Sequence, residues 1–331
     1  MLNVAVILFC SLVAFSVAAA QDPMSDRLEA AKREGTVLWY TGINLADARL
    51  LTDSFQRRYP FLKVQTYRAS GTQIISKIML EKKAGKPQFD VASSGVLRVL
   101  KDQGVLQPYS SPEASGFSPQ YRDPQGYWYG FYAQYYVVAY NVKMLSNSEI
   151  PKDWKDLLHP RWKDRIVMES EDQEWYGGML EASKDTGSNF LESLARQNIQ
   201  WRRNHALIGQ LIAAGEFPLG ITYAHRIEAL KKTGAPVDWV KTLRPIIAVV
   251  APLGLSTDAK HPASARLFLD FLISKRVQES MAKMGRIPVR MDVDPFPDYP
   301  GMNFTTHVVS ENFFTRLEEH AKGFRSTFGI R

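Results

Sequence analysis

Short apolar runs alternate with amphipathic segments, and this alternation most limits what the chain can fold into. The apolar run 36–40 is followed by a helical pattern over 45–59, and the run 62–67 by another over 71–84. Each helix should return the chain so that the next strand lies parallel, through a right-handed crossover. A further strand is predicted at 89–92. This pattern predicts an α/β fold, with a mainly parallel sheet covered by helices on both faces.

The second half of the chain shows the same alternation. No internal repeat and no Gly/Ser-rich linker separates it from the first half. Two lobes would therefore be joined by ordered strands, which we expect as crossovers near 130–137 and 243–251. The other elements predicted in this half are strands at 137–141 and 217–223 and helices near 174–184, 187–197, 204–214, 261–274, 276–284 and 310–322.

The first twenty residues differ from the rest. They carry no charge, contain an apolar run and end in three alanines at 18–20. The run is short for a bilayer span, which needs about 20 apolar residues, and charges resume at Asp22. We interpret 1–20 as a cleaved secretory signal peptide, with an uncleaved anchor as the alternative. Cys10 is the only cysteine, so the mature chain can form no disulfide and use no thiolate, which fits a bacterial periplasm.

The net charge of +7 belongs entirely to the mature chain, because residues 1–20 have no ionisable side chain. Such a charge could attract an anionic ligand, a membrane surface or nucleic acid. The basic residues are scattered in pairs and form no long stripe. Nucleic acid is therefore not expected as a partner.

A series of motifs follows in a fixed order. The most specific is Pro-Lys-Asp-Trp-Lys-Asp-Leu-Leu at 151–158, with Pro-Arg-Trp-Lys at 160–163. Weaker ones lie at 37–41, 55–60, 70–72, 89–91, 140–141, 215–216 and 265–274. With these motifs the chain resembles the periplasmic solute-binding proteins of ABC importers, in the branch that contains ferric-ion, thiamine and phosphonate binders.

The resemblance implies an α/β, two-lobed periplasmic-binding-protein (Venus-flytrap) fold, in which strand crossovers act as a hinge and the lobes close on one ligand. We expect lobe 1 at 21–130 with about 248–286, lobe 2 at 131–247, and a C-terminal helical tail at 287–331 packed on lobe 2. The implied function is capture of a small polar organic molecule or anion and its delivery to an ABC transporter permease in the inner membrane. The implied protein is a periplasmic monomer without a cofactor.

Ferric ion is the alternative ligand. The ferric binders of this family hold the metal largely through two adjacent tyrosines on the second lobe. The matching stretch 221–226 keeps Tyr223 but has Ala224 in place of the second tyrosine. For ferric iron the expected ligands would be Tyr223 and His225; otherwise no metal is expected.

Ligands of parallel sheets bind at the carboxyl ends of the strands, and this rule selects the candidate binding residues. Hydroxyl and backbone N–H groups at helix starts could bind an anion there, or could serve only as N-caps. On lobe 1 the candidates are Thr41, Gly42, Ser70, Gly71, Thr72, Ser93 and Ser94. On lobe 2 they are Glu171, Trp175, Tyr223, His225 and Arg226.

The lobe 2 candidates have distinct expected roles. Tyr223 would hydrogen-bond the ligand, His225 would donate or bind metal, and Arg226 would hold a carboxylate or phosphate. Alternatively, the three begin the next helix. In the acidic segment 169–176, Glu171 would bind a cation and Trp175 would offer a stacking face. Acids at a helix start are the structural alternative there.

Two further groups of aromatic residues are expected to serve packing. The run 127–136 should pack at the hinge, with a pocket lining as the alternative, and Trp154 and Trp162 should lie in the core.

Binding without chemistry is the expected function class, with no catalytic residues. A periplasmic hydrolase is the rival, but the sequence has no Gly-x-Ser-x-Gly, His-Glu-x-x-His, Walker or Gly-x-Gly-x-x-Gly motif. A solute-binding fold that docks on a signalling receptor is a third alternative.

Overall fold

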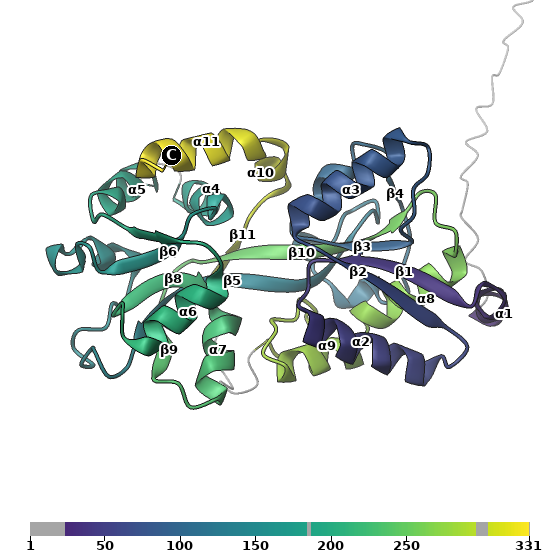
Figure 1. Cartoon of the computed structure of the whole chain (residues 1–331), viewed down its shortest axis with the longest axis horizontal. Helices are drawn as coiled ribbons and strands as arrows, with labels where there is room; N and C mark the ends of the chain where they lie inside the picture. Colours follow the sequence, from purple (N-terminus) through teal and green to yellow (C-terminus); the bar gives the residue numbers. More distant parts are fainter. Residues whose placement is uncertain (1–23, 184–186, 296–303, 331) are drawn as a thin grey trace, which may run out of the picture.

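The computed structural model describes residues 24–183, 187–295 and 304–330, so the interpreted signal peptide lies outside the described residues. Two α/β bodies lie side by side and are bridged by long strands (Figure 1). Their strands form one continuous sheet in the order β2-β1-β3-β10-β5-β8-β6-β7. Within the described ranges, no helix is both long and apolar enough to span a membrane. The two-lobed α/β fold expected from the sequence is confirmed.

Lobe 1 has a parallel core, in which β1 pairs with β2 on one side and β3 on the other. In Figure 1 α3 covers one face of this sheet, and α2 and α8 cover the other. Its elements are α1 (Met24–Glu34), β1 (Thr36–Thr41), α2 (Leu45–Arg58), β2 (Lys63–Arg68), α3 (Gly71–Lys83), β3 (Val91–Ser93), η1 (Leu97–Leu100), β4 (Leu106–Gln107), η2 (Ala114–Gly116), η3 (Pro119–Tyr121), α8 (Pro262–Ile273) and α9 (Lys275–Lys283).

Lobe 2 is also parallel at its centre, where β6 pairs with β7 and β8. Trp154 and Trp162 are buried, as predicted for core residues. The elements are η4 (Trp154–Leu158), η5 (Pro160–Trp162), β6 (Ile166–Glu169), α4 (Gln173–Ala182), α5 (Gly187–Ala195), β7 (Gln200–Arg202), α6 (His205–Ala214), β8 (Leu219–Tyr223), α7 (Ala224–Lys232) and β9 (Val237–Trp239).

Two long antiparallel strands, β5 (Tyr129–Asn141) and β10 (Ile246–Ser256), connect the lobes. β10 continues into lobe 1 by pairing with β3, and β5 continues into lobe 2 by pairing with β8. The register shifts between Ala251 and Pro252, where proline cannot donate to the ladder. The aromatic run 127–136 lies mostly on β5, and most of its rings are buried, as expected for packing, while Tyr132 also lines a cavity between the lobes.

The C-terminal segment departs from the expectation of a helical tail on lobe 2. It includes a strand, β11 (Thr306–Val308), which pairs with the amino-terminal half of β10. That edge of β10 is free because β3 and β4 pair only with its other half. Of the two helices that follow, α10 (Glu311–Thr315) contacts η1 of lobe 1, and α11 (Leu317–Phe328) packs on α4 and α5.

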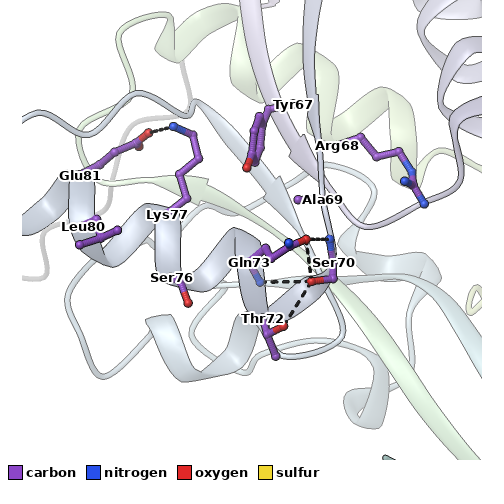
Figure 2. A pocket seen from close by; sticks show the side chains of 10 residues that line it. All are labelled: Tyr67, Arg68, Ala69, Ser70, Thr72, Gln73, Ser76, Lys77, Leu80 and Glu81. Carbon is purple, nitrogen blue, oxygen red and sulfur yellow. Dashed lines mark hydrogen bonds and ion pairs between the residues drawn. The ribbon is translucent and has the colours of Figure 1, made fainter. Parts of the chain in front are cut away.

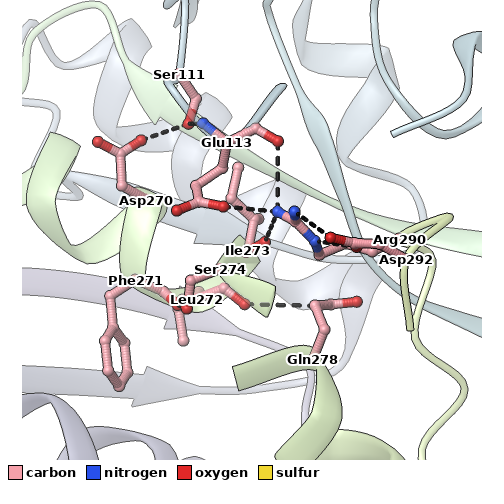
Figure 3. Close-up of polar contacts among 10 residues, drawn as sticks. All are labelled: Ser111, Glu113, Asp270, Phe271, Leu272, Ile273, Ser274, Gln278, Arg290 and Asp292. Carbon is pink, nitrogen blue, oxygen red and sulfur yellow. Dashed lines mark hydrogen bonds and ion pairs between the residues drawn. The ribbon is translucent and has the colours of Figure 1, made fainter. Parts of the chain in front are cut away.

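The beginning of the same segment is anchored to lobe 1 by Arg290. Its guanidinium donates to the carboxylate of Glu113 at 2.7 Å, to that of Asp292 at 2.8 Å, and to the carbonyl oxygen of Ile273 at 3.2 Å (Figure 3). An ideal Cβ on Gly116 would lie 2.3 Å from this guanidinium, so only glycine leaves it room. The C-terminal segment therefore ties both lobes together.

Candidate functional site

A groove of ≈ 370 Å³ lies between the lobes and is lined by both of them and by β5. This size falls within the range of small-ligand sites. Eight of the twelve predicted binding residues line it: Gly42, Ser70, Gly71, Thr72, Ser94, Glu171, Tyr223 and Arg226. The other lining residues were not among the predicted binding residues, although Glu169, Asp172, Gln173 and Glu174 lie in the acidic segment that the sequence singled out; they are Gly95, Val96, Tyr132, Gln134, Glu169, Asp172, Gln173, Glu174, Asn204, His205 and Leu317.

The lobe 1 wall is built from the start of α3 and the loop after β3. Ser70 caps α3 in a capping box: its hydroxyl accepts from the Gln73 backbone N–H at 3.4 Å, and the Gln73 side chain accepts from the Ser70 N–H at 3.1 Å. An ideal Cβ on Gly71 would lie 2.7 Å from the Ser94 hydroxyl. The helix start and the loop are therefore in close contact, and a ligand meets Thr72 and Ser94 along one continuous surface.

Thr41 and Ser93 do not line this wall. They pair directly in the register of β1 and β3, and the Ser93 hydroxyl donates to the Thr41 hydroxyl at 2.8 Å. The Trp39 indole donates to Ser93 at 3.1 Å, and the Ile43 N–H donates to Thr41 at 3.2 Å. Both side chains are buried and hold the strand ends together. The prediction that they face the ligand was wrong because the two hydroxyl groups hydrogen-bond to each other inside the sheet.

Trp175 and His225 are also absent from the groove wall. Trp175 is fully buried, with its ring 5.7 Å from that of Trp154, so it cannot serve as a stacking face. His225 is 5% exposed and lies beside Arg286 of the lobe 1 side, with 3.3 Å between Nε2 and the guanidinium. Burial and this guanidinium lower the pKa of His225 well below its usual value. These two predictions were wrong because both rings point into packed interiors.

A cluster of Glu169, Asp172 and His205 forms the centre of the lobe 2 wall. One ligand atom from each lies within 4.8 Å of the others. Glu169 ends β6, Asp172 precedes α4, and His205 begins α6. The acidic segment 169–176 was the sequence signal for the two carboxylates, whereas nothing in the sequence singled out His205.

The hydrogen bonds around His205 fix the role of each ring nitrogen. The Thr222 hydroxyl donates to the His205 carbonyl oxygen at 3.3 Å, so the ring Nδ1 is the donor to Thr222 at 3.2 Å. The other nitrogen, Nε2, lies 3.0 Å from the Asp172 carboxylate. Either a proton on Nε2 or a cation shared with the carboxylate is required at that position.

Two tyrosines adjoin this cluster. The hydroxyl groups of Tyr136 and Tyr223 lie 3.2 Å apart, and Tyr136 donates to Asp172 at 3.1 Å. Burial, followed by the charge of Asp172, raises the pKa of both phenols well above the usual value. The Tyr223 ring also lies 3.7 Å from the His205 ring, centroid to centroid. Strand β5 thus places a second, buried tyrosine beside Tyr223.

The carboxylates of this wall resist being charged together. Burial raises the pKa of Glu174 to about 7, and the neighbouring Asp172 acts in the same direction. Burial also raises the pKa of Glu169. Asp172 itself is buried, and its Oδ2 has no hydrogen-bond partner. A buried carboxylate oxygen without a partner is costly, so the wall is arranged for a positively charged guest.

Arg226 adds a positively charged side chain to the groove. It lines the cavity from α7, and its Nε is buried without a hydrogen-bond partner. Burial and the nearby Arg286 lower the pKa of this guanidinium. Together with the start of α3 on lobe 1, Arg226 can hold an anion in the same groove as the acidic cluster.

Comparisons with known proteins identify a relative in sequence and relatives in fold. A Fe(3+)-binding periplasmic protein of Serratia marcescens is 22% identical over 229 residues, which are 66% of this chain and 68% of that protein. Iron-bound HitA from Pseudomonas aeruginosa has a TM-score of 0.78 at 20% identity, with 88% of this chain and 99% of HitA covered. AfuA from Actinobacillus pleuropneumoniae, with exogenous fructose-6-phosphate bound, has a TM-score of 0.76 at 20% identity over 90% of this chain and all (100%) of AfuA.

A family model described as bacterial extracellular solute-binding protein matches residues 87–304, more than half of the sequence. The chain therefore belongs to the bacterial extracellular solute-binding proteins, which bind ligands for ABC importers.

Proposed function

We propose that this protein captures a metal ion, with ferric iron as the best fit, together with an anion in the interlobe groove for an ABC importer. The observation that carries the proposal is the Glu169–Asp172–His205 cluster. Asp172 keeps one oxygen buried and unpartnered, and His205 Nε2 faces the other oxygen. A cation between these atoms would satisfy both groups at once.

The donor atoms support a hard, highly charged ion. Two carboxylates and the Tyr223 phenol supply oxygen, and His205 adds one nitrogen. Oxygen donors suit hard cations, and a bound metal can deprotonate a phenol whose pKa is otherwise raised. The Serratia marcescens relative is named as a Fe(3+)-binding protein, and HitA is iron-bound, which supports ferric iron first. His205 replaces the His225 expected from the sequence.

An anion in the same groove completes the proposed cargo. The guanidinium of Arg226 and the backbone N–H groups at the start of α3 supply its binding groups. A sugar phosphate alone, such as AfuA binds, is disfavoured because it would leave the acidic cluster without a cation. The organic or anionic solute expected from the sequence is retained here only as the partner of the metal.

Binding without catalysis is part of the proposal. The family binds and transports solutes. A serine nucleophile needs a histidine nitrogen that is free to accept its proton. Both ring nitrogens of His205, the groove's histidine, are engaged, one with Thr222 and the other with Asp172. A hydrolytic triad in this groove is therefore disfavoured.

A thermal-shift titration of the mature protein tests the proposal. Ferric citrate should raise the melting temperature saturably, because a ligand at a hundred times its Kd adds about 2.7 kcal/mol to the native state. Asp172→Asn should abolish that shift, whereas the control Asp53→Asn, on the exposed face of α2, should keep it. Fructose-6-phosphate and putrescine serve as the metal-free anion and cation. A shift with either of these and none with any metal would refute a metal cargo.

A further inference from the structure

A cavity of ≈ 340 Å³ lies on lobe 1 and shares no lining residue with the interlobe groove. Three of its lining residues are arginines: Arg57 and Arg58 in the last turn of α2, and Arg276 in the first turn of α9. Ser54 and Phe271 complete the described lining, which contains no acidic residue. Because several guanidinium groups surround one cavity, it favours a multiply charged anion such as a phosphate group.

The helices α2 and α9 run beside each other in opposite directions. The end of α2 meets the start of α9 at the cavity, whereas Asp47, near the start of α2, pairs at 2.7 Å with Arg286, which follows the end of α9. Both helices lie on the side of lobe 1 that is opposite α3 (Figure 1). Their exposed side chains therefore form one surface, which we call the α2–α9 face.

The α2–α9 face carries a large share of the net charge of the chain. Its exposed acidic residues are Asp53 and Glu279. Its exposed basic residues are Arg49, Arg57, Arg58, Lys275, Arg276 and Lys283. Six positive charges against two negative ones leave an excess of four, compared with +7 for the whole chain. A face with such an excess attracts negatively charged surfaces.

Helix electrostatics explain only some of these cations. The two arginines of α2 lie in its last turn, where the helix dipole favours positive charge. Lys275 and Arg276 begin α9, where the dipole disfavours positive charge, and no acidic residue balances them in that turn. Within the described ranges, none of the three cavity arginines forms an ion pair. On the other side of the lobe, by contrast, Lys77 lies 2.7 Å from Glu81 of its own helix (Figure 2).

Leu50 adds an exposed apolar side chain to the α2–α9 face. It precedes Ser54 by four residues and Arg57 by seven, so the three lie along one row of α2. Leu50 is 55% exposed, and the buried Phe271 gives the cavity an apolar wall. A soluble anion would make no use of an exposed leucine. A phospholipid, however, offers a phosphate to the arginines and apolar groups to Leu50.

We propose that the α2–α9 face docks on a membrane surface of anionic phospholipid, with a headgroup phosphate in the arginine cavity. The guanidinium groups bind the phosphate oxygens, the Ser54 hydroxyl donates to them, and Leu50 contacts the glycerol and upper acyl groups. Docking by this face leaves the interlobe groove open, because the two cavities share no residue. The inference is independent of the metal proposed as cargo.

Co-sedimentation of the mature protein with lipid vesicles tests the inference. The wild type should bind vesicles of phosphatidylcholine with phosphatidylglycerol and should not bind phosphatidylcholine alone. The double variant Arg57→Gln/Arg276→Gln should lower the partition coefficient on the mixed vesicles about 25-fold, since each cation near an anionic surface contributes about fivefold. The control Lys83→Gln/Lys86→Gln removes the same charge from exposed positions on the α3 side and should bind like the wild type.

The outcomes separate the membrane from other anionic partners. Wild-type binding by the Arg57→Gln/Arg276→Gln variant, or an equal loss in the control, would refute docking by the α2–α9 face. Isothermal titration with glycerol 1-phosphate and with polyglutamate supplies the soluble probes. If glycerol 1-phosphate binds through Arg276 while the mixed vesicles do not bind, the cavity is a site for a free phosphate. If only polyglutamate binds through these arginines, the partner is an acidic protein. Either result overturns membrane docking.

Discussion

Glu174 in the groove offers the sharpest test of the electrostatic reasoning. It lies in the first turn of α4 and lines the cavity beside Asp172. Burial raises its pKa from an ordinary value of 4.5 to about 7. Glu174→Gln keeps the shape of the side chain and removes the charge. In the apoprotein this substitution should stabilise the native state, although it deletes a hydrogen-bonding carboxylate.

The size of this stabilisation depends on pH. Because the folded-state pKa is the higher one, the native protein keeps a proton that the unfolded chain has already lost between 4.5 and about 7. The free energy of unfolding therefore falls as pH rises through this window. Each pKa unit is worth about 1.4 kcal/mol, so the full cost reaches about 3 kcal/mol as an upper value. Above the window the wild type bears this cost and the Gln variant does not.

Urea unfolding of the metal-free proteins at about pH 4 and about pH 8 measures the difference. We expect Glu174→Gln to exceed the wild type by about 1–3 kcal/mol at the higher pH and to equal it at the lower. Glu279→Gln, at an exposed position of α9, is the control and should change neither value. Equal effects of Glu174→Gln at both pH values would show that the carboxyl is not strained by its surroundings.

Three other substitutions test packing and lobe contacts. Gly178→Ala would place a Cβ 2.4 Å from Ile247, so urea unfolding should show a loss of about 1–3 kcal/mol. Arg286→Met removes the 2.7 Å ion pair with Asp47 and the contact with His225 across the lobes, and small-angle scattering of the apoprotein should show a larger radius of gyration. Trp175→Phe should lower stability without changing metal affinity, because its ring is packed in the core; a weaker metal affinity would restore its predicted ligand role.

Much of the fold could be predicted because it depends on long, periodic segments. The alternation over 36–92 predicted the parallel core of lobe 1, and the predicted crossovers lie on β5 and β10. β11 could not be predicted, since three residues carry no measurable period. It forms because one edge of β10 is left open by the other strands, a fact of topology that the local sequence does not contain.

The site was predicted where strand ends alone determine it and missed where distant segments meet. Ser70, Gly71 and Tyr223 follow the rule for the carboxyl ends of strands and do line the groove; their role in binding stays a prediction. Thr41 obeys the same rule, but the register pairs it with Ser93. The contact of Asp172 with His205 joins the starts of two different helices, which no local pattern reveals.

The net charge of the chain and the charge of the acidic cluster in the groove have opposite signs, and this affects how a ligand reaches the site. The net charge of +7 produces a long-range field that repels a free cation and attracts an anion. Solvent ions screen both fields beyond about 10 Å at ordinary salt, and at such distances the net positive charge of the chain outweighs the few carboxylates of the cluster. A negatively charged metal complex suits both charges: the positive field of the protein attracts the complex, and the acidic cluster then binds its metal. Added salt should therefore slow the association of an anionic ferric complex more than its dissociation, whereas for a bare cation it should speed association.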